Sequence, residues 1–177
     1  NVKTGGILAM ATKGDFNCNT PFALSSEEQK QVDALSGEER SKKLSELRNR
    51  QWRNKAISDA YEPGSVFKVI IGVEENVATY STSFNCPGYI VIAGQRYSCH
   101  KHAGHGMQNL TQATQNSCNP YFINLGQQIG VNTFSKYFEA FGLTEKTGID
   151  LPGEAGSQYH KAEKMGPTEL ASESFGQ

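Results

Sequence analysis

The tetrapeptide SVFK at residues 65–68, which follows directly on Pro63 and Gly64, restricts the fold and chemistry of this chain more than any other segment. Pro and Gly favour a sharp entry into a helix that begins at Ser65. A three-residue offset on a helix places the Lys68 amine on the same face as the Ser65 hydroxyl. The helix is predicted to be buried, because its first two turns are almost wholly apolar. Burial lowers the pKa of an amine, so Lys68 becomes the neutral base that a serine nucleophile needs.

An S-x-x-K tetrapeptide has a simpler explanation when it stands alone. Serine and lysine are common residues, and such a pair usually marks a solvated helix face. Lys68 can also be a structural lysine that pairs with a carboxylate such as Glu62. The assignment of a nucleophile and its base therefore depends on a second motif elsewhere in the chain.

That second motif is the tripeptide SCN at residues 117–119. It lies in a run of turn formers, 116–120, between a polar helical stretch and an apolar one. A loop of this kind presents side chains into a cleft. Ser117 can relay a proton between Lys68 and a leaving group, and the Asn119 amide can hold a peptide carbonyl of a substrate. The alternative is an ordinary helix cap.

With S-x-x-K and S-x-N in this order, the chain resembles the penicillin-binding proteins. The resemblance extends to the opening segment KTGGILAM at 3–10 and to the approach to Ser65, NKAISDAYEPGS at 54–65. It includes His105-Gly106, TGIDLPGE at 147–154 and SFGQ at 174–177, which look like landmarks of the class B, monofunctional subgroup. It implies an α+β fold like that of penicillin-binding proteins and serine beta-lactamases, with an antiparallel sheet and a helical subdomain.

The resemblance also implies a role for each motif residue. Ser65 is the acylated nucleophile and Lys68 its general base, while Ser117 shuttles protons and Asn119 binds the substrate amide. The implied enzyme is a D,D-transpeptidase that cross-links peptidoglycan through D-Ala-D-Ala stem peptides. Beta-lactams mimic that substrate and are expected to acylate Ser65. Three alternatives remain: a beta-lactam-sensing receptor, a serine beta-lactamase, and a module that only folds or binds metal.

A third family motif, K-T-G on a core strand downstream of S-x-N, is missing from its expected place. One K-T-G string, at 3–5, lies in the opening turn, and another, at 146–148, leads into a loop. Neither has the required position. Residues 1–177 are therefore expected to be part of one transpeptidase domain that is truncated before the K-T-G strand, with no membrane anchor or pedestal domain present.

Charge and hydropathy limit the partners. The formal net charge of −1 argues against nucleic acid or anionic lipid as the main partner, because both demand clustered Lys and Arg. No apolar run approaches the roughly 20 residues of a membrane span. The resemblance implies a place at the extracytoplasmic face of the cell membrane, through an N-terminal anchor missing from this sequence. The expected partners are stem peptides, beta-lactams and other cell-wall synthesis proteins.

The pattern of residues also predicts the local structure. Two strands are expected within 1–16, and one or two helices within 25–53, with Ser26 and Ser36 as N-caps. Short strands are expected within 81–105 and helices within 110–141, followed by a loop-rich tail from 142 to 167.

A possible metal site lies in the middle of the chain. Cys86 and Cys99 flank a segment that reads as a strand with turns at both ends, and three histidines follow Cys99. Thiolate and imidazole are the ligands that zinc prefers, so the sequence predicts a structural zinc bound by Cys86, Cys99, His100 and His102. His105 looks like an ordinary family feature and Cys118 like a buried small hydrophobe, while Cys18 is a further ligand or a free thiol. The alternatives are a Cys86–Cys99 disulfide or reduced, packed cysteines.

Overall fold

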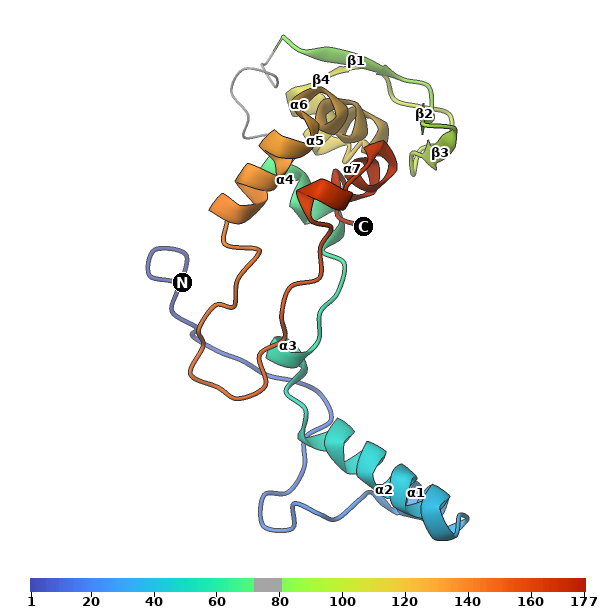
Figure 1. The fold of residues 1–177 in the computed structure, drawn as a ribbon, viewed down its shortest axis with the longest axis vertical. Coiled ribbons are helices and arrows are strands. Elements are labelled where there is room, and N and C mark those ends of the chain that lie inside the picture. Colours follow the sequence, from blue (N-terminus) through green and yellow to red (C-terminus); the bar gives the residue numbers. More distant parts are fainter. Residues whose placement is uncertain (72–80) are drawn as a thin grey trace. The chain divides into compact units, whose positions relative to one another are not determined.

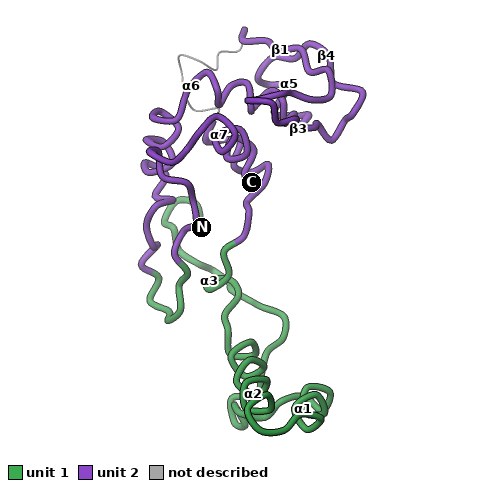
Figure 2. Tube along the Cα trace, turned by 45° about the vertical axis from the view of Figure 1, so that its right-hand side comes forward, with its two compact units in different colours: residues 1–60, 149–155 green, residues 61–148, 156–177 purple. Residues whose placement is uncertain are grey.

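The computed structural model describes residues 1–71 and 81–177, and Figure 1 labels its helices and strands. The chain divides into two compact units, which are coloured separately in Figure 2. Unit 1 contains residues 1–60 and 149–155, and unit 2 contains residues 61–148 and 156–177. The two predicted catalytic motifs both belong to unit 2.

Unit 1 is built on helices α1 (Ser26–Asp33), α2 (Gly37–Trp52) and α3 (Lys55–Ser58). The prediction of one or two helices within 25–53 is confirmed, and two are present. The N-cap of α1 is Ser25 and not Ser26, because the Ser25 hydroxyl and the Glu28 carboxylate form a capping box. Ser36 precedes α2 as predicted, although its side chain makes no capping hydrogen bond.

The predicted strands within residues 1–16 are absent from the structure. This segment begins with a turn, in which the N–H of Gly5 donates to Asn1 O at 2.9 Å, and then runs as irregular chain. A strand needs a neighbour to satisfy its backbone groups, and within the described residues none pairs with this segment. Its apolar side chains are accordingly exposed, Ile7 by 58% and Leu8 by 85%.

The described part of unit 2 carries four short strands, three of them within 81–105 as predicted and the fourth just beyond that range. β1 (Ser83–Cys86) pairs antiparallel with β4 (Gly106–Asn109), and β2 (Tyr89–Ile92) pairs antiparallel with β3 (Gln95–Ser98). The β2–β3 turn has positive φ at both central residues, Ala93 and Gly94, which suits a two-residue hairpin. Cys86 ends β1 and Cys99 directly follows β3.

The helices of unit 2 surround its core. They are the 3₁₀ turn η1 (Gly64–Phe67), α4 (Lys68–Ile71), α5 (Leu110–Gln115), α6 (Asn119–Ala140, kinked at Gly130), η2 (Ala162–Lys164) and α7 (Pro167–Glu173). Phe67 and Ile71 pack in one cluster with Tyr121, Phe122 and other side chains of α6. The core therefore joins the helix that follows Ser65 to the helix that begins at Asn119.

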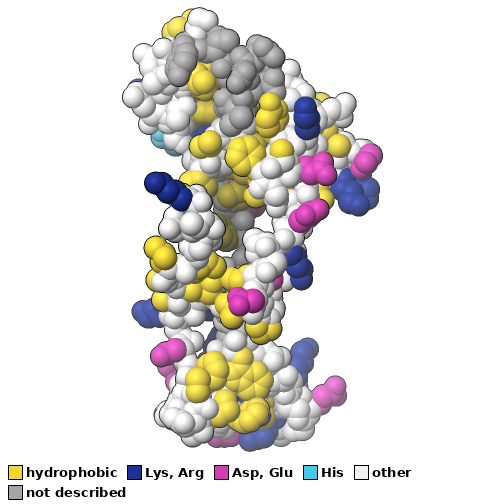
Figure 3. All heavy atoms as spheres, turned by 90° about the vertical axis from the view of Figure 1, so that its left-hand side faces the viewer, with side chains coloured by type: hydrophobic (Ala, Val, Ile, Leu, Met, Phe, Trp, Pro, Cys, Tyr) yellow, Lys and Arg dark blue, Asp and Glu magenta, His cyan; other side chains and the backbone are white. Residues whose placement is uncertain are grey.

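Some apolar side chains of this region lie at the surface, and Figure 3 shows hydrophobic patches open to solvent on one face of the molecule. Val66 and Val69 are 74% and 64% exposed, whereas Phe67, Lys68 and Ile71 are buried. The prediction that the helix after Gly64 is buried on most sides is therefore wrong: one side faces the core and the other is open. No helix among the described residues has the length and apolarity needed to cross a bilayer.

Candidate active site

A 3₁₀ turn brings the two residues of the first motif together. The N–H of Lys68 donates to Ser65 O, so the chain closes a three-residue turn before α4 begins. Side chains three residues apart eclipse one another in a 3₁₀ turn. Lys68 Nζ lies 3.1 Å from Ser65 Oγ as a result. The offset predicted from the sequence is correct, but the turn is 3₁₀ and not the first turn of an α-helix.

The second motif lies between α5 and α6. The Cys118 N–H donates to Ala113 O at 2.9 Å, which folds the link back onto α5. Ser117 has a φ of 47°, a left-handed conformation that only Ala93 shares among the described non-glycine residues. Such a conformation persists where the surrounding structure holds it, and it occurs most often at functional sites. Asn119 opens α6, with Pro120 next to it in the first turn.

Lys68 Nζ is the centre of the resulting network. It donates to Ser65 Oγ at 3.1 Å, to Ser117 Oγ at 3.0 Å, to Ser117 O at 2.8 Å and to Asn119 Oδ1 at 2.6 Å. Ser117 Oγ also donates to Ser65 Oγ at 2.9 Å. The structure therefore brings together all four residues that the sequence nominated for catalysis, in one hydrogen-bonded group.

The surroundings of Lys68 increase the share of its neutral form relative to a solvated lysine. Its side chain is 4% exposed, and burial lowers the pKa of the amine to about 8, while the nearby Cys118 and Cys99 thiols oppose this shift. With a pKa of about 8, about a tenth of the molecules hold a neutral amine at pH 7. A neutral amine has a lone pair that can accept the Ser65 hydroxyl proton, so the arrangement can activate a serine nucleophile.

A cluster of cysteine and histidine side chains lies beside this network. The ligand atoms of Cys86, Cys99, His105 and Cys118 are all within 4.8 Å of one another, and Cys99 Sγ is 3.5 Å from His105 Nδ1. Tetrahedral zinc with bonds of about 2.0–2.3 Å places its ligand atoms roughly 3.5–3.8 Å apart, so the four atoms need only small shifts to surround an ion. Their chemistry and their burial both fit zinc.

Two loops meet closely to form this cluster. The Cys99 N–H donates to Gly88 O at 2.8 Å, which joins the end of β3 to the turn after β1. Gly104 has a φ of +79°, and a Cβ built there would lie 2.2 Å from Cys86 O. Only glycine allows this approach, which carries the chain back so that His105 faces Cys99.

The pKa shifts within the cluster differ from one residue to the next. Burial, together with the nearby His100 and Lys101, lowers the pKa of His105, so the neutral ring is favoured at pH 7. Burial raises the pKa of the Cys118 thiol to about 12. Burial also raises the pKa of Cys86, but backbone N–H donors of His105 and Gly88 outweigh it and hold that pKa below its usual value. A neutral His105 ring and a lowered Cys86 pKa favour metal binding, whereas the raised pKa of Cys118 opposes it, because that thiol must lose its proton to bind zinc.

The cluster differs from the predicted ligand set. Cys86 and Cys99 belong to it, but His100 and His102 do not, and His105 and Cys118 take the two remaining places. His100 Nδ1 is still 3.9 Å from Cys99 Sγ, so it lies next to the cluster without belonging to it. All four cysteines of the chain are free, including the exposed Cys18, so the structure contains no Cys86–Cys99 disulfide. The fold brings His105 and Cys118 into the cluster, and neither was in the predicted ligand set.

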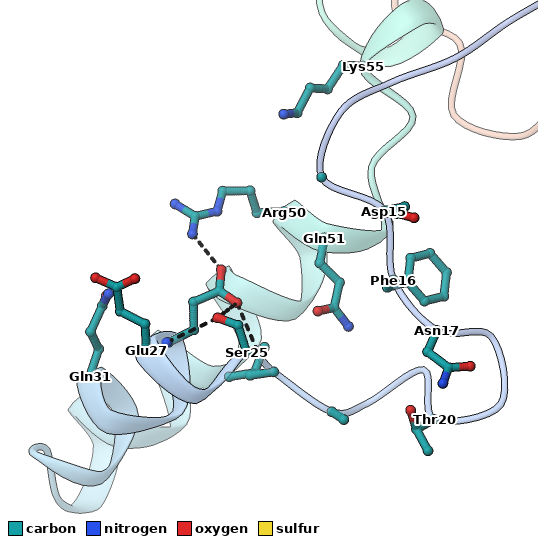
Figure 4. A pocket seen from close by; sticks show the side chains of 14 residues that line it. Asp15, Phe16, Asn17, Thr20, Ser25, Glu27, Gln31, Arg50, Gln51 and Lys55 are labelled. Carbon is teal, nitrogen blue, oxygen red and sulfur yellow. Dashed lines mark hydrogen bonds and ion pairs between the residues drawn. The ribbon is translucent and has the colours of Figure 1, made fainter.

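Unit 1 contains a separate hollow of about 670 Å³, drawn in Figure 4. Its lining carries mixed charges, and Arg50 pairs with Glu28 at 2.8 Å across it. None of the side chains that line it belongs to either motif or to the cysteine cluster. The candidate catalytic residues and the cysteine cluster therefore belong to unit 2, whereas this hollow belongs to unit 1.

A serine within reach of a buried amine and a second serine is the arrangement of a lysine-activated serine acyltransferase. The chain matches the family described as "Penicillin binding protein transpeptidase domain" over residues 1–177, and it belongs to that family. The predicted class B penicillin-binding protein and its α+β fold are confirmed by this match and by the relatives below.

Two curated relatives illustrate the similarity. Stage V sporulation protein D of Bacillus subtilis is 40% identical over 129 residues, which are 71% of this chain and 20% of the relative. Peptidoglycan D,D-transpeptidase MrdA of Acinetobacter baumannii is 30% identical over 166 residues, which are 91% of this chain and 23% of the relative. The chain thus spans about a fifth to a quarter of the length of these relatives.

Solved structures show the same fold. The D,D-transpeptidase domain of a peptidoglycan glycosyltransferase from Eggerthella lenta matches 98% of this chain and 39% of its own, with a TM-score of 0.72 and 27% identity. Penicillin-binding protein PBP2 from Helicobacter pylori, solved in a complex with MreC, matches 80% of this chain and 28% of its own, with a TM-score of 0.67 and 26% identity.

Proposed function

We propose that the chain is part of a serine D,D-transpeptidase that cross-links peptidoglycan. The observation that carries this proposal is Lys68 Nζ, which lies 3.1 Å from Ser65 Oγ and 3.0 Å from Ser117 Oγ inside a family of transpeptidases. The substrate is a stem peptide that ends in D-Ala-D-Ala. Beta-lactams, which mimic that terminus, acylate the same serine.

The acylation step follows from the network. Neutral Lys68 accepts the Ser65 hydroxyl proton while Ser65 Oγ forms a bond to the carbonyl carbon of the penultimate D-alanine. The Ser65 N–H, in the first turn of the helical segment, donates to the developing oxyanion. When the C–N bond breaks, the Ser117 hydroxyl donates its proton to the leaving D-alanine nitrogen and recovers one from Lys68. An ester on Ser65 remains, and an amine of a neighbouring strand attacks it to form the cross-link.

Asn119 has a different role. Its Oδ1 accepts from Lys68 at 2.6 Å, which leaves the two Nδ2 protons of Asn119 available for a substrate carbonyl. Asn119 therefore orients both the base and the stem peptide. None of these steps needs a metal or another cofactor.

The 177 residues make up only part of the transpeptidase domain in this proposal. The aligned residues make up only 20% and 23% of the two relatives. Apolar side chains such as Ile7, Leu8, Val66 and Val69 are exposed, and exposed apolar surface of this kind is typical of a site that a further segment covers. A K-T-G strand elsewhere in the full-length protein completes the site in this proposal. An N-terminal anchor would hold the protein at the extracytoplasmic face of the membrane, with other cell-wall synthesis proteins as partners, since a relative has been solved with MreC.

Two related functions share the acylation step and differ afterwards. A beta-lactam-sensing receptor holds the acyl group as a signal, and a serine beta-lactamase passes it to water. The segments at 54–65 and 147–154 that resemble class B proteins, and the match to D,D-transpeptidases, favour transfer to an amine.

The full-length protein should therefore release D-alanine from a stem peptide and transfer the remainder to an amine acceptor. The measurement is mass spectrometry of the products formed with a D-Ala-D-Ala peptide, with and without a D-amino acid as acceptor. Slow turnover of penicillin, with a stable adduct, is expected in the same preparation. Rapid hydrolysis of penicillin would instead identify a beta-lactamase, and adduct formation without any peptide turnover would identify a receptor.

The cysteine cluster is proposed to hold a structural zinc ion. Its ligands are Cys86, Cys99, His105 and Cys118, a set that replaces the one expected from the sequence. An ion there would fix the end of β1, the loop after β3 and the S-x-N loop to one another, because each contributes a ligand. Cys118, which lies between Ser117 and Asn119, belongs to both the cluster and the S-x-N motif.

The full-length protein is expected to contain about one zinc per chain, and the variants His105→Ala and Cys99→Ser are expected to fall below about 0.2. Inductively coupled plasma mass spectrometry after dialysis measures the content, and chelation should lower the melting temperature of the wild type. His100→Ala and Cys18→Ser are matched controls, because neither residue belongs to the cluster. Loss of zinc from His100→Ala, with zinc retained in His105→Ala, would contradict this ligand set.

A further inference from the structure

Helix α7 packs against α6 (Figure 1), and the Ser174 side chain at the end of α7 comes very close to Gly126 of α6. A Cβ built on Gly126 of α6 would lie 1.9 Å from Ser174 Oγ and 2.9 Å from Ser174 Cβ. Ser174 is fully buried, and its hydroxyl donates to Leu170 O at 2.6 Å, so it cannot move aside freely. The end of α7 is therefore fixed against the helix that begins at Asn119.

The chain leaves α7 through a tight turn centred on Gly176. The Gly176 N–H donates to Glu173 O at 3.1 Å, and the Gln177 N–H donates to Ser172 O at 3.1 Å. This pair of hydrogen bonds, with a φ of +85° at Gly176, is the Schellman pattern of a helix C-terminus. Its effect is to aim the Gly176 carbonyl away from the helix.

That carbonyl reaches the turn that carries the nucleophile. The N–H of Gly64, the residue directly before Ser65, donates to Gly176 O at 3.0 Å. The approach is close: a Cβ on Gly176 would lie 2.2 Å from Gly64 O and 2.7 Å from Gly64 N. The atoms that such a Cβ would meet all belong to the backbone of Gly64, so no side-chain rotation can relieve the collision.

We propose that Gly176 is a positioning residue for the acylation step, and that the C-terminal turn of α7 sets the distance between the two catalytic motifs. Gly176 holds the turn that begins the S-x-x-K motif, while Ser174 against Gly126 holds the helix that follows the S-x-N motif. The inference rests on the proposed function, since it concerns the geometry of acylation at Ser65. It assigns a role to two glycines that touch no substrate.

The expected cost of disturbing this contact is large, because a nucleophile displaced by about 1 Å loses on the order of 100-fold in rate. A methyl group on Gly176 must push Gly64 away, and Ser65 moves with it. Gly176→Ala is therefore expected to lower the first-order acylation rate constant of the full-length protein by about 10- to 100-fold. The dissociation constant for the preceding non-covalent complex should change by less than about threefold, since the substrate contacts of Asn119 remain.

The test measures acylation by a fluorescent penicillin in stopped flow, over a range of drug concentrations that separates the rate constant from the dissociation constant. Gly94→Ala is the matched control. Gly94 has the same φ of +85° at the β2–β3 turn, but a Cβ there meets no atom within 4 Å. Both variants carry the same backbone strain, and only one collides with the nucleophile turn.

The final burst amplitude distinguishes positioning from a general loss of stability. A merely destabilised variant has fewer active molecules, but each of them reacts at the wild-type rate. A rate constant in Gly176→Ala that equals those of Gly94→Ala and the wild type would overturn the inference. Acylation of the wild type in the same experiment would leave the proposed function standing. Absence of acylation in the wild type would reject both.

If Gly176→Ala does not fold, Gly126→Ala provides the same test from the other side of α7. Its rate constant is expected to fall, and the double variant Gly126→Ala/Ser174→Gly to recover much of the loss, because the second change removes the atoms that collide. A wild-type rate constant in Gly126→Ala would count against the inference.

Discussion

Replacing Ser65 with alanine should abolish covalent labelling of the full-length protein by penicillin, a loss of at least about 10⁴-fold in the rate of adduct formation. The hydroxyl removed is the atom that forms the ester, and Ser117 cannot replace it. Ser117 Oγ donates to Ser65 Oγ at 2.9 Å, so its position is that of a proton relay beside the nucleophile. Intact-mass measurement after incubation with the drug gives the fraction of labelled chains, and peptide mapping gives the labelled residue.

The fold should survive this substitution. Ser65 Oγ contributes hydrogen bonds to Lys68 and Ser117, and a hydrogen bond is worth about 1 kcal/mol in stability. The melting temperature of Ser65→Ala should therefore lie within a few degrees of the wild type. Ser157→Ala, at an exposed position of the same unit, is the control and should label normally. A wild-type yield of adduct in Ser65→Ala would exclude Ser65 as the nucleophile.

The four candidate catalytic residues could be predicted because each of the two motifs is a short, continuous stretch of sequence. Ser65 and Lys68 are related by one turn, and any right-handed helical turn brings their side chains together. Ser117 and Asn119 stand in a short loop between two helical segments, and the turn formers around them are visible in the sequence. What the sequence does not contain is the distance between the two motifs, because it depends on packing between segments, including that of Phe67 and Ile71 on α6.

The members of the cysteine cluster were only half predictable for the opposite reason. His100 and His102 follow Cys99 closely, but neighbours along an irregular loop point in different directions. His105 reaches the cluster because the backbone of Gly104 passes close to Cys86, and Cys118 arrives from a distant loop. Both effects depend on contacts between segments. The cysteine inside the S-x-N motif was the one sequence feature that could have pointed to Cys118 as a member of the cluster.

The errors elsewhere have the same origin. Strands predicted within residues 1–16 have the right apolar pattern, but no described strand pairs with them, and a pattern alone cannot supply a ladder of hydrogen bonds. Helix α7 was not predicted, although Pro167 and Glu169 after Gly166 form an N-terminal signature that could have revealed it. The role proposed for α7 depends on the contacts that its C-terminal turn makes with Gly64 and Gly126, and these contacts cannot be read from the sequence.

Replacing Lys68 should separate the two explanations of this residue, a base or a fixed cation. Lys68→Met removes the amine and is expected to lower the acylation rate constant by about 10²–10⁴-fold, the usual range for a general base. Lys68→Arg keeps a positive charge but cannot be deprotonated, so it should be almost as slow. An electrostatic role would instead be rescued by arginine. Lys136→Met, an exposed lysine on α6, is the control and should react at the wild-type rate.

The pH dependence gives an independent measure of the same base. Burial lowers the Lys68 pKa to about 8, so the reactive neutral form is scarce at low pH and increases as the pH rises. The acylation rate constant should increase about tenfold per pH unit below 7 and level off above about 8.5. Lys68→Met should lose this dependence along with its rate. A flat wild-type profile between pH 6 and pH 9, or a rate that falls as the pH rises through about 8, would show that proton transfer to Lys68 does not limit attack by Ser65.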